Sequence, residues 1–345
     1  MRTFRGGLLI GLAVAVLVAA AAITYERYDT RTLKRTVRRG EVLCGVNKGL
    51  PGFSIPDDKG NWTGFDVDFC RAVAAAIFDD PSKARFVPLD ANERFKELES
   101  RKVDILSRNS TWSMARELDY DLYFPAVAYY DGQGFMLPRA RNIDNALDLK
   151  GSKVCVQSNT TTQLNLADYF RANHMNYEEV KFDKLDDVIK AYDAGKCDTL
   201  TSEISQLYAL RLNLSKPNDH TILPDLISKE PLAPVVRQRD DDWMMIVKWT
   251  LYAMIDAEEL GVTSKNIDEA LKSKKPDVMR LVGTEGNYGE QLGLTNDWAV
   301  RVIRHVGNYG EMYDRNIGAD SKLKIPRGMN QLWNAGGVQY APPIR

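Results

Sequence analysis

The chain repeats one order of predicted strands and helices, and this repeat constrains its fold more than any other feature. Each half has the order strand, helix, strand, helix, strand. In the first half these segments lie at residues 41–46, 69–77, 85–89, 93–99 and 103–106, and in the second half at 153–156, 161–172, 180–182, 185–194 and 197–200. The helices show apolar residues three and four positions apart, and Asp66 is placed to cap the first one. This order implies a parallel sheet, so the sequence predicts two similar α/β lobes.

Two extended segments predict a hinge of two crossing strands. They lie at residues 125–137 and 231–236, between the two halves. We therefore expect a first lobe at residues 36–134, a second lobe at 135–234, and a return to the first lobe at 235–345 with a C-terminal helical extension. Strand ends and helix N-termini of both lobes would then face one cleft, which is a natural ligand site. Hinge motion would close the lobes around the ligand.

The last third of the chain is poorer in strands. Residues 243–257 and 267–271 read as helices, and the pentapeptide Gly-Asn-Tyr-Gly-Glu occurs twice, at 286–290 and 307–311. A functional loop is one interpretation of this repeat. We favour glycines at helix termini, where their backbone freedom is useful.

The N-terminus predicts export. Arg2 and Arg5 precede an apolar run from Leu8 to Ile23, which has 16 residues. A spanning helix needs ~20 residues. A basic start, a short apolar core and small residues at its end are typical of a secretory signal peptide, here residues 1–23. An uncleaved anchor is the alternative reading, and the absence of a cysteine just after the run disfavours a lipoprotein.

Composition disfavours nucleic acid as a partner. The 345 residues carry a net charge of -1, with 44% hydrophobic and 27% charged residues, which is ordinary for a globular protein. No basic stripe with interleaved aromatics is present. The length suits two domains plus additional segments.

The cysteines predict disulfides. An even number in an exported chain favours pairing, and four cysteines allow three connectivities. Because two lie in each half, we favour Cys44–Cys70 and Cys155–Cys197. Zinc is the alternative, but no CxxC occurs, and the three histidines, His174, His220 and His305, are isolated. We expect no metal site.

Polar residues at the strand ends could hold a zwitterion. A free amino acid needs an arginine for its carboxylate and an acid for its ammonium. In the first lobe, Thr111 and Ser113 precede Arg116, and Glu203 takes the equivalent place in the second lobe. The run at 158–162 offers N–H groups and hydroxyls. Ordinary helix caps and surface ion pairs would explain the same residues.

Several longer stretches carry a resemblance. They are CGVNKGLPGFSIPDDKGNWTGFDVDFCRAVAAAIF, SRNSTWSMAREL, YYDGQGFMLPR, VCVQSNTTTQLNLADYF and SKEPLAPVVRQ. In these stretches the chain resembles the family 3 solute-binding proteins of polar amino acid ABC transporters. More narrowly, it resembles the periplasmic general L-amino acid binding proteins. The likeness runs from about residue 36 to the C-terminus. It implies a two-lobed periplasmic-binding-protein fold of type II.

The resemblance also implies roles for first-lobe residues. Arg116 matches the arginine that binds the α-carboxylate, and Thr111 and Asn109 match positions that offer polar groups to the ligand. Phe53 matches an aromatic residue near the floor of the cleft.

In the second lobe, Thr161 matches a threonine whose N–H meets the carboxylate. Glu203 matches the acid, more often aspartate, that receives the α-ammonium. Asn159 replaces a common glycine, and asparagine tolerates positive φ better than most residues. Leu50 stands where relatives of narrow specificity often place an aromatic wall, which is consistent with broad acceptance of side chains.

The expected function is therefore capture of L-amino acids in the periplasm and delivery to the permease of an ABC transporter. The resemblance implies a monomer without a cofactor. An enzyme on the same fold, such as a dehydratase, is a second hypothesis, but Glu203 is the only evident acid or base and no catalytic set stands out. An anchored sensory receptor is a third, and it would require an uncleaved N-terminal helix.

Overall fold

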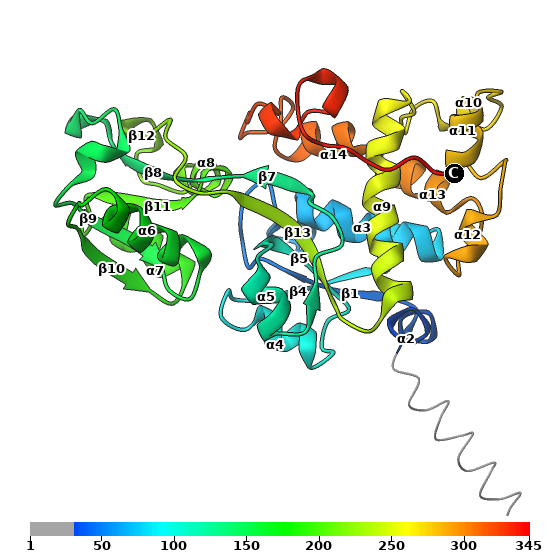
Figure 1. The fold of residues 1–345 in the computed structure, drawn as a ribbon, viewed down its shortest axis with the longest axis horizontal. Helices are drawn as coiled ribbons and strands as arrows, with labels where there is room; N and C mark the ends of the chain where they lie inside the picture. Colours follow the sequence, from blue (N-terminus) through cyan, green and yellow to red (C-terminus); the bar gives the residue numbers. More distant parts are fainter. Residues whose placement is uncertain (1–30) are drawn as a thin grey trace, which may run out of the picture.

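The fold has two lobes joined by a pair of strand segments, as the ribbon in Figure 1 shows. The computed structural model describes residues 31–345. The predicted signal peptide lies outside these residues. Within 31–345, no helix is long and apolar enough to cross a bilayer.

Lobe 1 is the part of the molecule built on a six-stranded sheet. Its strand order is β4-β1-β5-β13-β6, and β7 also pairs with β13. The strands are β1 (Val42–Val46), β4 (Ala84–Pro88), β5 (Ile105–Thr111), β6 (Leu122–Tyr123), β7 (Tyr129–Asp131) and β13 (Glu230–Arg237). β1 is parallel to β4 and β5, as predicted, whereas β13 runs antiparallel to β5.

Helices and a small hairpin surround this sheet. They are α2 (Thr32–Arg39), α3 (Phe65–Phe78), α4 (Arg94–Glu99), α5 (Met114–Asp119) and the hairpin of β2 (Ile55–Pro56) and β3 (Trp62–Thr63). α3 is mostly apolar, and it packs against β1, β5 and the long α9 (Asp241–Glu259). Burial of this apolar helix between the sheet and α9 forms the centre of the lobe.

The first turn of α3 corrects one prediction. The N-cap is Gly64, not Asp66, which lies inside the helix and makes no capping bond. Gly64 has φ 130°, and a Cβ there would lie 2.1 Å from the backbone oxygen of Phe53. Asp66 instead accepts a hydrogen bond of 3.1 Å from Ser107. Burial raises the pKa of its carboxyl to about 7.

Lobe 2 is built on a five-stranded sheet with the order β10-β9-β11-β8-β12. Its elements are β8 (Gln133–Pro138), β9 (Lys153–Gln157), α6 (Thr161–Ala172), β10 (Glu178–Phe182), α7 (Leu185–Asp193), β11 (Thr199–Glu203), α8 (Ile204–Arg211) and β12 (His220–Ile222). β9 is parallel to β10 and β11, and β8 is antiparallel to β11. The repeated strand and helix order thus folds into two similar sheets.

The hinge consists of β7 running into β8 and of the start of β13. β7 and β13 pair antiparallel, with Asp131 opposite Glu230. The chain leaves lobe 1 at Asp131 and enters the sheet of lobe 2 at Gln133, and β13 belongs to the sheet of lobe 1. Asp131 also accepts a 2.5 Å hydrogen bond from Ser205 in lobe 2, so its carboxylate ties the hinge to α8.

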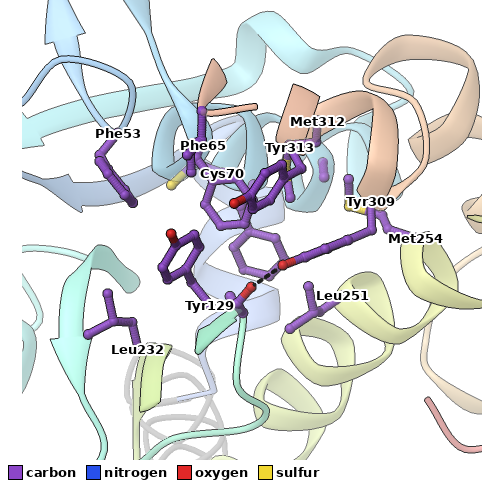
Figure 2. Close-up of a cluster of buried hydrophobic side chains, with 14 of the residues drawn as sticks. Phe53, Phe65, Cys70, Tyr129, Leu232, Leu251, Met254, Tyr309, Met312 and Tyr313 are labelled. Carbon is purple, nitrogen blue, oxygen red and sulfur yellow. Dashed lines mark hydrogen bonds between the residues drawn. The ribbon is translucent and has the colours of Figure 1, made fainter. Parts of the chain in front are cut away.

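The residues after α9 pack on lobe 1 as a helical extension. Their helices are α10 (Ile267–Ala270), α11 (Pro276–Leu281), α12 (Tyr288–Gln291), α13 (Trp298–His305) and α14 (Tyr309–Asn316). Figure 2 shows Tyr309 and Tyr313 of α14 facing Phe65 and Tyr129 in an aromatic cluster. Tyr309 donates a 2.8 Å hydrogen bond to the Ala128 carbonyl, just before β7. The extension therefore contacts the hinge strand directly.

Both copies of Gly-Asn-Tyr-Gly-Glu begin a helix. Gly286 and Gly307 have φ of 84° and 95°, and the asparagine that follows each is the N-cap. In the second copy the Asn308 side chain forms a capping box with Glu311. The repeat is a helix-start motif, in agreement with the glycine interpretation.

Each lobe contains one disulfide. Cys44 of β1 is bonded to Cys70 of α3, and Cys155 of β9 is bonded to Cys197. These are the pairs that the distribution of the cysteines favours.

Candidate functional site

One pocket between the lobes brings together most of the predicted ligand residues. Seven residues from each lobe line it. Among them are Asn109, Thr111 and Arg116 of lobe 1, and Thr161 and Glu203 of lobe 2. These residues lie at the ends of β5 and β11, on α5 and at the start of α6. The two-lobe prediction expects strand ends and helix starts of this kind to face the cleft.

Arg116 is held in place from within lobe 1. It lies on α5, whose N-cap Ser113 accepts the Arg116 N–H. Its Nη1 donates a 2.7 Å hydrogen bond to the Thr111 carbonyl, and its Cζ lies 5.3 Å from the centre of the Phe95 ring. Burial lowers the pKa of the guanidinium, against the attraction of Glu203 and Glu230. The remaining N–H donors are available for a carboxylate.

Glu203 is the acid of lobe 2 in this pocket. It ends β11 and is 8% exposed. Ser202 donates a 2.9 Å hydrogen bond to its Oε2. Burial, followed by the negative charge of Glu230, raises the pKa of its carboxyl. A cation beside such a buried acid stabilises its ionised form, and a ligand ammonium is a suitable cation.

The N-terminus of α6 points its first residues into the same pocket. Thr160 is the N-cap and accepts a hydrogen bond from the Gln163 N–H, so Thr161 is the first helical residue. Thr160, Thr161 and Thr162 all line the pocket. The unpaired N–H groups and the positive end of the helix dipole favour an anion there.

Two asparagines in this region adopt positive φ. Asn159, which replaces a glycine common in the family, has φ 59°. Asn109 has φ 46°. The Asn109 Oδ1 is buried without a hydrogen-bond partner among the described residues. Asparagine is among the few residues that tolerate this conformation.

Phe53 lies elsewhere than the other predicted residues. It is 1% exposed and does not line the pocket of Arg116 and Glu203. Its ring packs edge-on against Phe65 and Tyr129, as Figure 2 shows, and it shares a small neighbouring cavity with Asn109. Phe53 therefore packs in the aromatic cluster next to the pocket and does not line the pocket itself.

Glu230 joins the two lobes and was missed by sequence reasoning. It is 1% exposed at the start of β13. Its Oε2 accepts hydrogen bonds from Thr111 of lobe 1 at 2.5 Å and Thr161 of lobe 2 at 3.2 Å. Its Oε1 accepts from Asn165 and Ser228. The quoted stretch SKEPLAPVVRQ contains Glu230, but nothing in its spacing points to this role.

Two further arginines of lobe 1 line the pocket and were also missed. Arg94 starts α4 and Arg108 lies on β5, and they are 3% and 6% exposed. Arg108 donates a 3.0 Å hydrogen bond to the Leu89 carbonyl. Arg94 belongs to a helix with an ordinary amphipathic pattern, so the sequence gives no signal that its side chain is buried.

The described residues contain no group of three or more histidines, cysteines and acids that could hold a metal ion. The pocket instead combines arginines, one acid, hydroxyls and helix N–H groups. These groups can form charge-assisted hydrogen bonds with a ligand that carries both a carboxylate and an ammonium.

Comparisons with known proteins place this geometry in a family. The profile of the bacterial extracellular solute-binding proteins, family 3, matches residues 42–266. The chain belongs to this family. The fold agrees, because a periplasmic binding protein of an ABC transporter from Brucella ovis, solved with glutathione bound, superposes with a TM-score of 0.90 at 52% identity, over 92% of this chain and 100% of that one.

Relatives similar over nearly the whole length extend the comparison. The chain is 53% identical over 97% of its length, and 98% of the relative, to the general L-amino acid-binding periplasmic protein of Rhizobium johnstonii. It is 46% identical, over 97% of both chains, to the glutamate/glutamine/aspartate/asparagine-binding protein of Rhodobacter capsulatus. The type of fold inferred from the sequence, two lobes with a hinge and a cleft, is confirmed.

Proposed function

We propose that the pocket binds L-α-amino acids of several kinds, with Arg116 on the carboxylate and Glu203 on the ammonium. One observation carries this proposal: an arginine of lobe 1 and a buried acid of lobe 2 line the same pocket. Thr111, Asn109 and the Thr161 N–H add polar partners for the carboxylate. The carboxylate and the ammonium of the ligand are then bound by different lobes. Binding therefore favours the closed arrangement of the two lobes.

The protein would act by capture and delivery. The hinge of β7 and β13 allows the lobes to close on the ligand, and the closed form would dock on the permease of an ABC transporter. The names of the relatives, which are periplasmic and amino-acid binding, support this role and an exported protein. The proposal includes a cleaved signal peptide, a monomer and no catalytic residue.

Glutathione is a second candidate ligand because of the Brucella ovis relative solved with it. The γ-glutamyl end of glutathione carries a free α-ammonium and a free α-carboxylate. Arg116 and Glu203 would hold that end in the same way as a free amino acid. Its remaining residues would need room beyond the zwitterion.

Calorimetric titration tests the proposal. The mature protein is unfolded and refolded to remove any carried ligand, then titrated with each common L-amino acid and with glutathione. We expect several L-amino acids to bind, and Arg116→Ala to weaken each of them about 100-fold, because a buried charge pair loses one partner.

Arg85→Ala is the matched control, since Arg85 is an exposed arginine of lobe 1 that pairs with Glu41. It should bind as the wild type does. Absence of binding by every L-amino acid would refute the proposal, and binding of glutathione alone would replace the ligand while keeping the role of Arg116.

A further inference from the structure

A second pocket lies in the helical extension and shares no lining residue with the pocket between the lobes. Its volume is about 240 Å³. Residues of α9 and α11 form one side, and residues from the segment 333–345 cover them. In Figure 1 this last segment, drawn in red, crosses α9 and runs toward α11. The Nε of Arg280 in α11 donates a 2.8 Å hydrogen bond to the Ile344 carbonyl, which holds the segment in place.

Two acids of α9 line this pocket without a cation beside them. Asp256 and Glu259 are three residues apart, so they lie on one face of the helix. Neither forms an ion pair with any residue in 31–345. The third acid of the pocket, Asp277, is already paired with Arg280 and lies 3.9 Å from Arg345. The pocket therefore carries negative charge that its own arginines do not offset.

Asp256 is the buried member of this group. It is 9% exposed, and its Oδ2 is buried without a hydrogen-bond partner in the part of the chain that the structure describes. Burial, together with the negative charges of Glu259 and Asp277, raises the pKa of its carboxyl to about 7. A buried carboxylate oxygen without a donor is costly. A bound ammonium would supply both the hydrogen bond and the counter-charge.

Two exposed aromatic side chains also line the pocket. The ring centres of Trp333 and Tyr340 lie 5.6 Å apart at an angle of 61°. The Trp333 indole N–H donates a 3.1 Å hydrogen bond to Glu259, which holds this ring next to the acids. Aromatic faces attract cations. Carboxylates without counter-charge beside aromatic rings favour a ligand that has a positive charge and an apolar body.

The composition of the pocket favours an organic cation over a metal ion. No three acids, histidines or cysteines among the described residues are grouped so that they could hold a metal, so the carboxylates of the pocket do not converge on one point. Leu260, Leu281 and Ile344 add apolar surface to the lining. The volume is below the roughly 300–1,000 Å³ of pockets for drug-sized molecules, which indicates a small ligand.

We propose that this pocket is a second ligand site, which binds a small alkyl amine, preferably a diamine. One ammonium group would donate to the unpaired Oδ2 of Asp256, and the second would pair with Glu259. The alkyl chain would pack against the apolar residues and the two aromatic rings. Such a ligand has no carboxylate and therefore differs in chemistry from the amino acids of the cleft. This inference does not depend on the proposed function.

Calorimetric titration with amines of one chain length tests the inference. The mature protein is titrated with 1,4-diaminobutane, with 1-aminobutane and with neutral 1,4-butanediol at pH 8, where Asp256 is ionised and alkyl ammonium groups remain charged. We expect the diamine to bind more tightly than the monoamine, and the diol not to bind. Asp256→Asn should weaken diamine binding about tenfold, because a charge-assisted hydrogen bond is lost. Tyr340→Leu should weaken it about threefold.

Two further variants control for charge and folding. Glu269→Gln removes an exposed acid of the same extension that does not line the pocket, and it should bind the diamine as the wild type does. Glu259→Gln removes an exposed acid that does line the pocket, and it should also weaken diamine binding. This variant keeps the test valid if Asp256→Asn folds poorly.

Three results would overturn the inference. The first is absence of binding by 1,4-diaminobutane at millimolar concentrations. The second is equal binding of the diol and the diamine, since charge would then play no part. The third is unchanged diamine affinity in Asp256→Asn and Glu259→Gln, which would place the bound amine elsewhere on the protein. Amino acid binding should be the same in the wild type and in Asp256→Asn, so failure of this inference leaves the proposed function untouched.

Discussion

The two sides of the pocket differ in charge, although both lobes follow the same strand and helix order. Lobe 1 contributes three arginines, Arg94, Arg108 and Arg116, while lobe 2 contributes one acid, Glu203, with the hydroxyls and N–H groups at the start of α6. A zwitterion therefore finds its full set of partners only where the lobes meet. Similar backbones thus carry complementary chemistry, and under the proposed function recognition of the whole ligand depends on closure.

Removal of the acid of lobe 2 should cause the largest loss of ligand affinity. We expect Glu203→Gln to weaken amino acid binding about 100-fold, because the ligand ammonium is left buried without a counter-charge. Calorimetry measures the loss. Glu178→Gln, at an exposed position of the same lobe, is the matched control. Wild-type affinity in Glu203→Gln would show that another group receives the ammonium.

Substitution of Glu230 tests whether the two lobes are held together when no ligand is bound. Its carboxylate accepts four hydrogen bonds, from Thr111, Thr161, Asn165 and Ser228. We expect Glu230→Ala to lower the free energy of unfolding by about 2–4 kcal/mol, because buried donors lose their acceptor. Urea unfolding measures this change.

The same variant should also alter the shape of the protein without ligand. Because Glu230 bonds to both lobes, Glu230→Ala should increase the radius of gyration in small-angle X-ray scattering. Glu99→Ala, at an exposed position of α4, should change neither quantity. Loss of stability without a change in the radius of gyration would mean that Glu230 supports the hinge but does not hold the lobes together.

The same comparison shows what the sequence could and could not predict. The lobes, the hinge and the placing of Arg116 and Glu203 near strand ends follow from local patterns, because strand ends in an α/β fold meet at one edge. Their expected roles toward a ligand came from the resemblance to the family, since local patterns allow helix caps and surface ion pairs equally. Arg94 and Glu230 were missed. Arg94 lies in a short amphipathic helix and Glu230 at the start of an extended segment, where charged residues are usually solvated. Their burial comes from contacts between distant parts of the chain, which a local pattern does not encode.

The pH dependence of ligand binding tests whether Glu203 of lobe 2 receives the ligand ammonium. Burial and Glu230 raise the pKa of Glu203 in the free protein. A ligand ammonium favours the ionised carboxylate, so binding lowers this pKa and releases a proton. Affinity should therefore fall as pH decreases through the raised pKa, by at most about tenfold per pH unit for one proton.

Titrations from pH 8 to pH 5, in buffers of different ionisation enthalpy, measure the proton released. Asp66 and Asp131, whose pKa values are raised to about 7, titrate in the same range. Glu203→Gln separates the contributions, because its remaining binding should lose most of the pH dependence. An unchanged pH profile in Glu203→Gln would assign the proton to one of those aspartates.

The smallest effect concerns the hydroxyl and the N–H of Thr161, which can be removed separately. Thr161 is the first residue of α6, where proline is tolerated because its missing N–H has no partner inside the helix. The preceding Thr160 has φ -121° and ψ 161°, which is compatible with a following proline. Thr161→Pro therefore deletes the proposed N–H donor, and Thr161→Val deletes only the hydroxyl.

Both variants lose the side-chain hydrogen bond to Glu230, so their difference isolates the N–H. We expect Thr161→Pro to weaken amino acid binding about fivefold relative to Thr161→Val, the worth of one hydrogen bond. Equal affinities in the two variants would mean that the Thr161 N–H does not bind the ligand carboxylate. The carboxylate would then be held by Arg116 and its neighbours in lobe 1 rather than by this N–H of lobe 2.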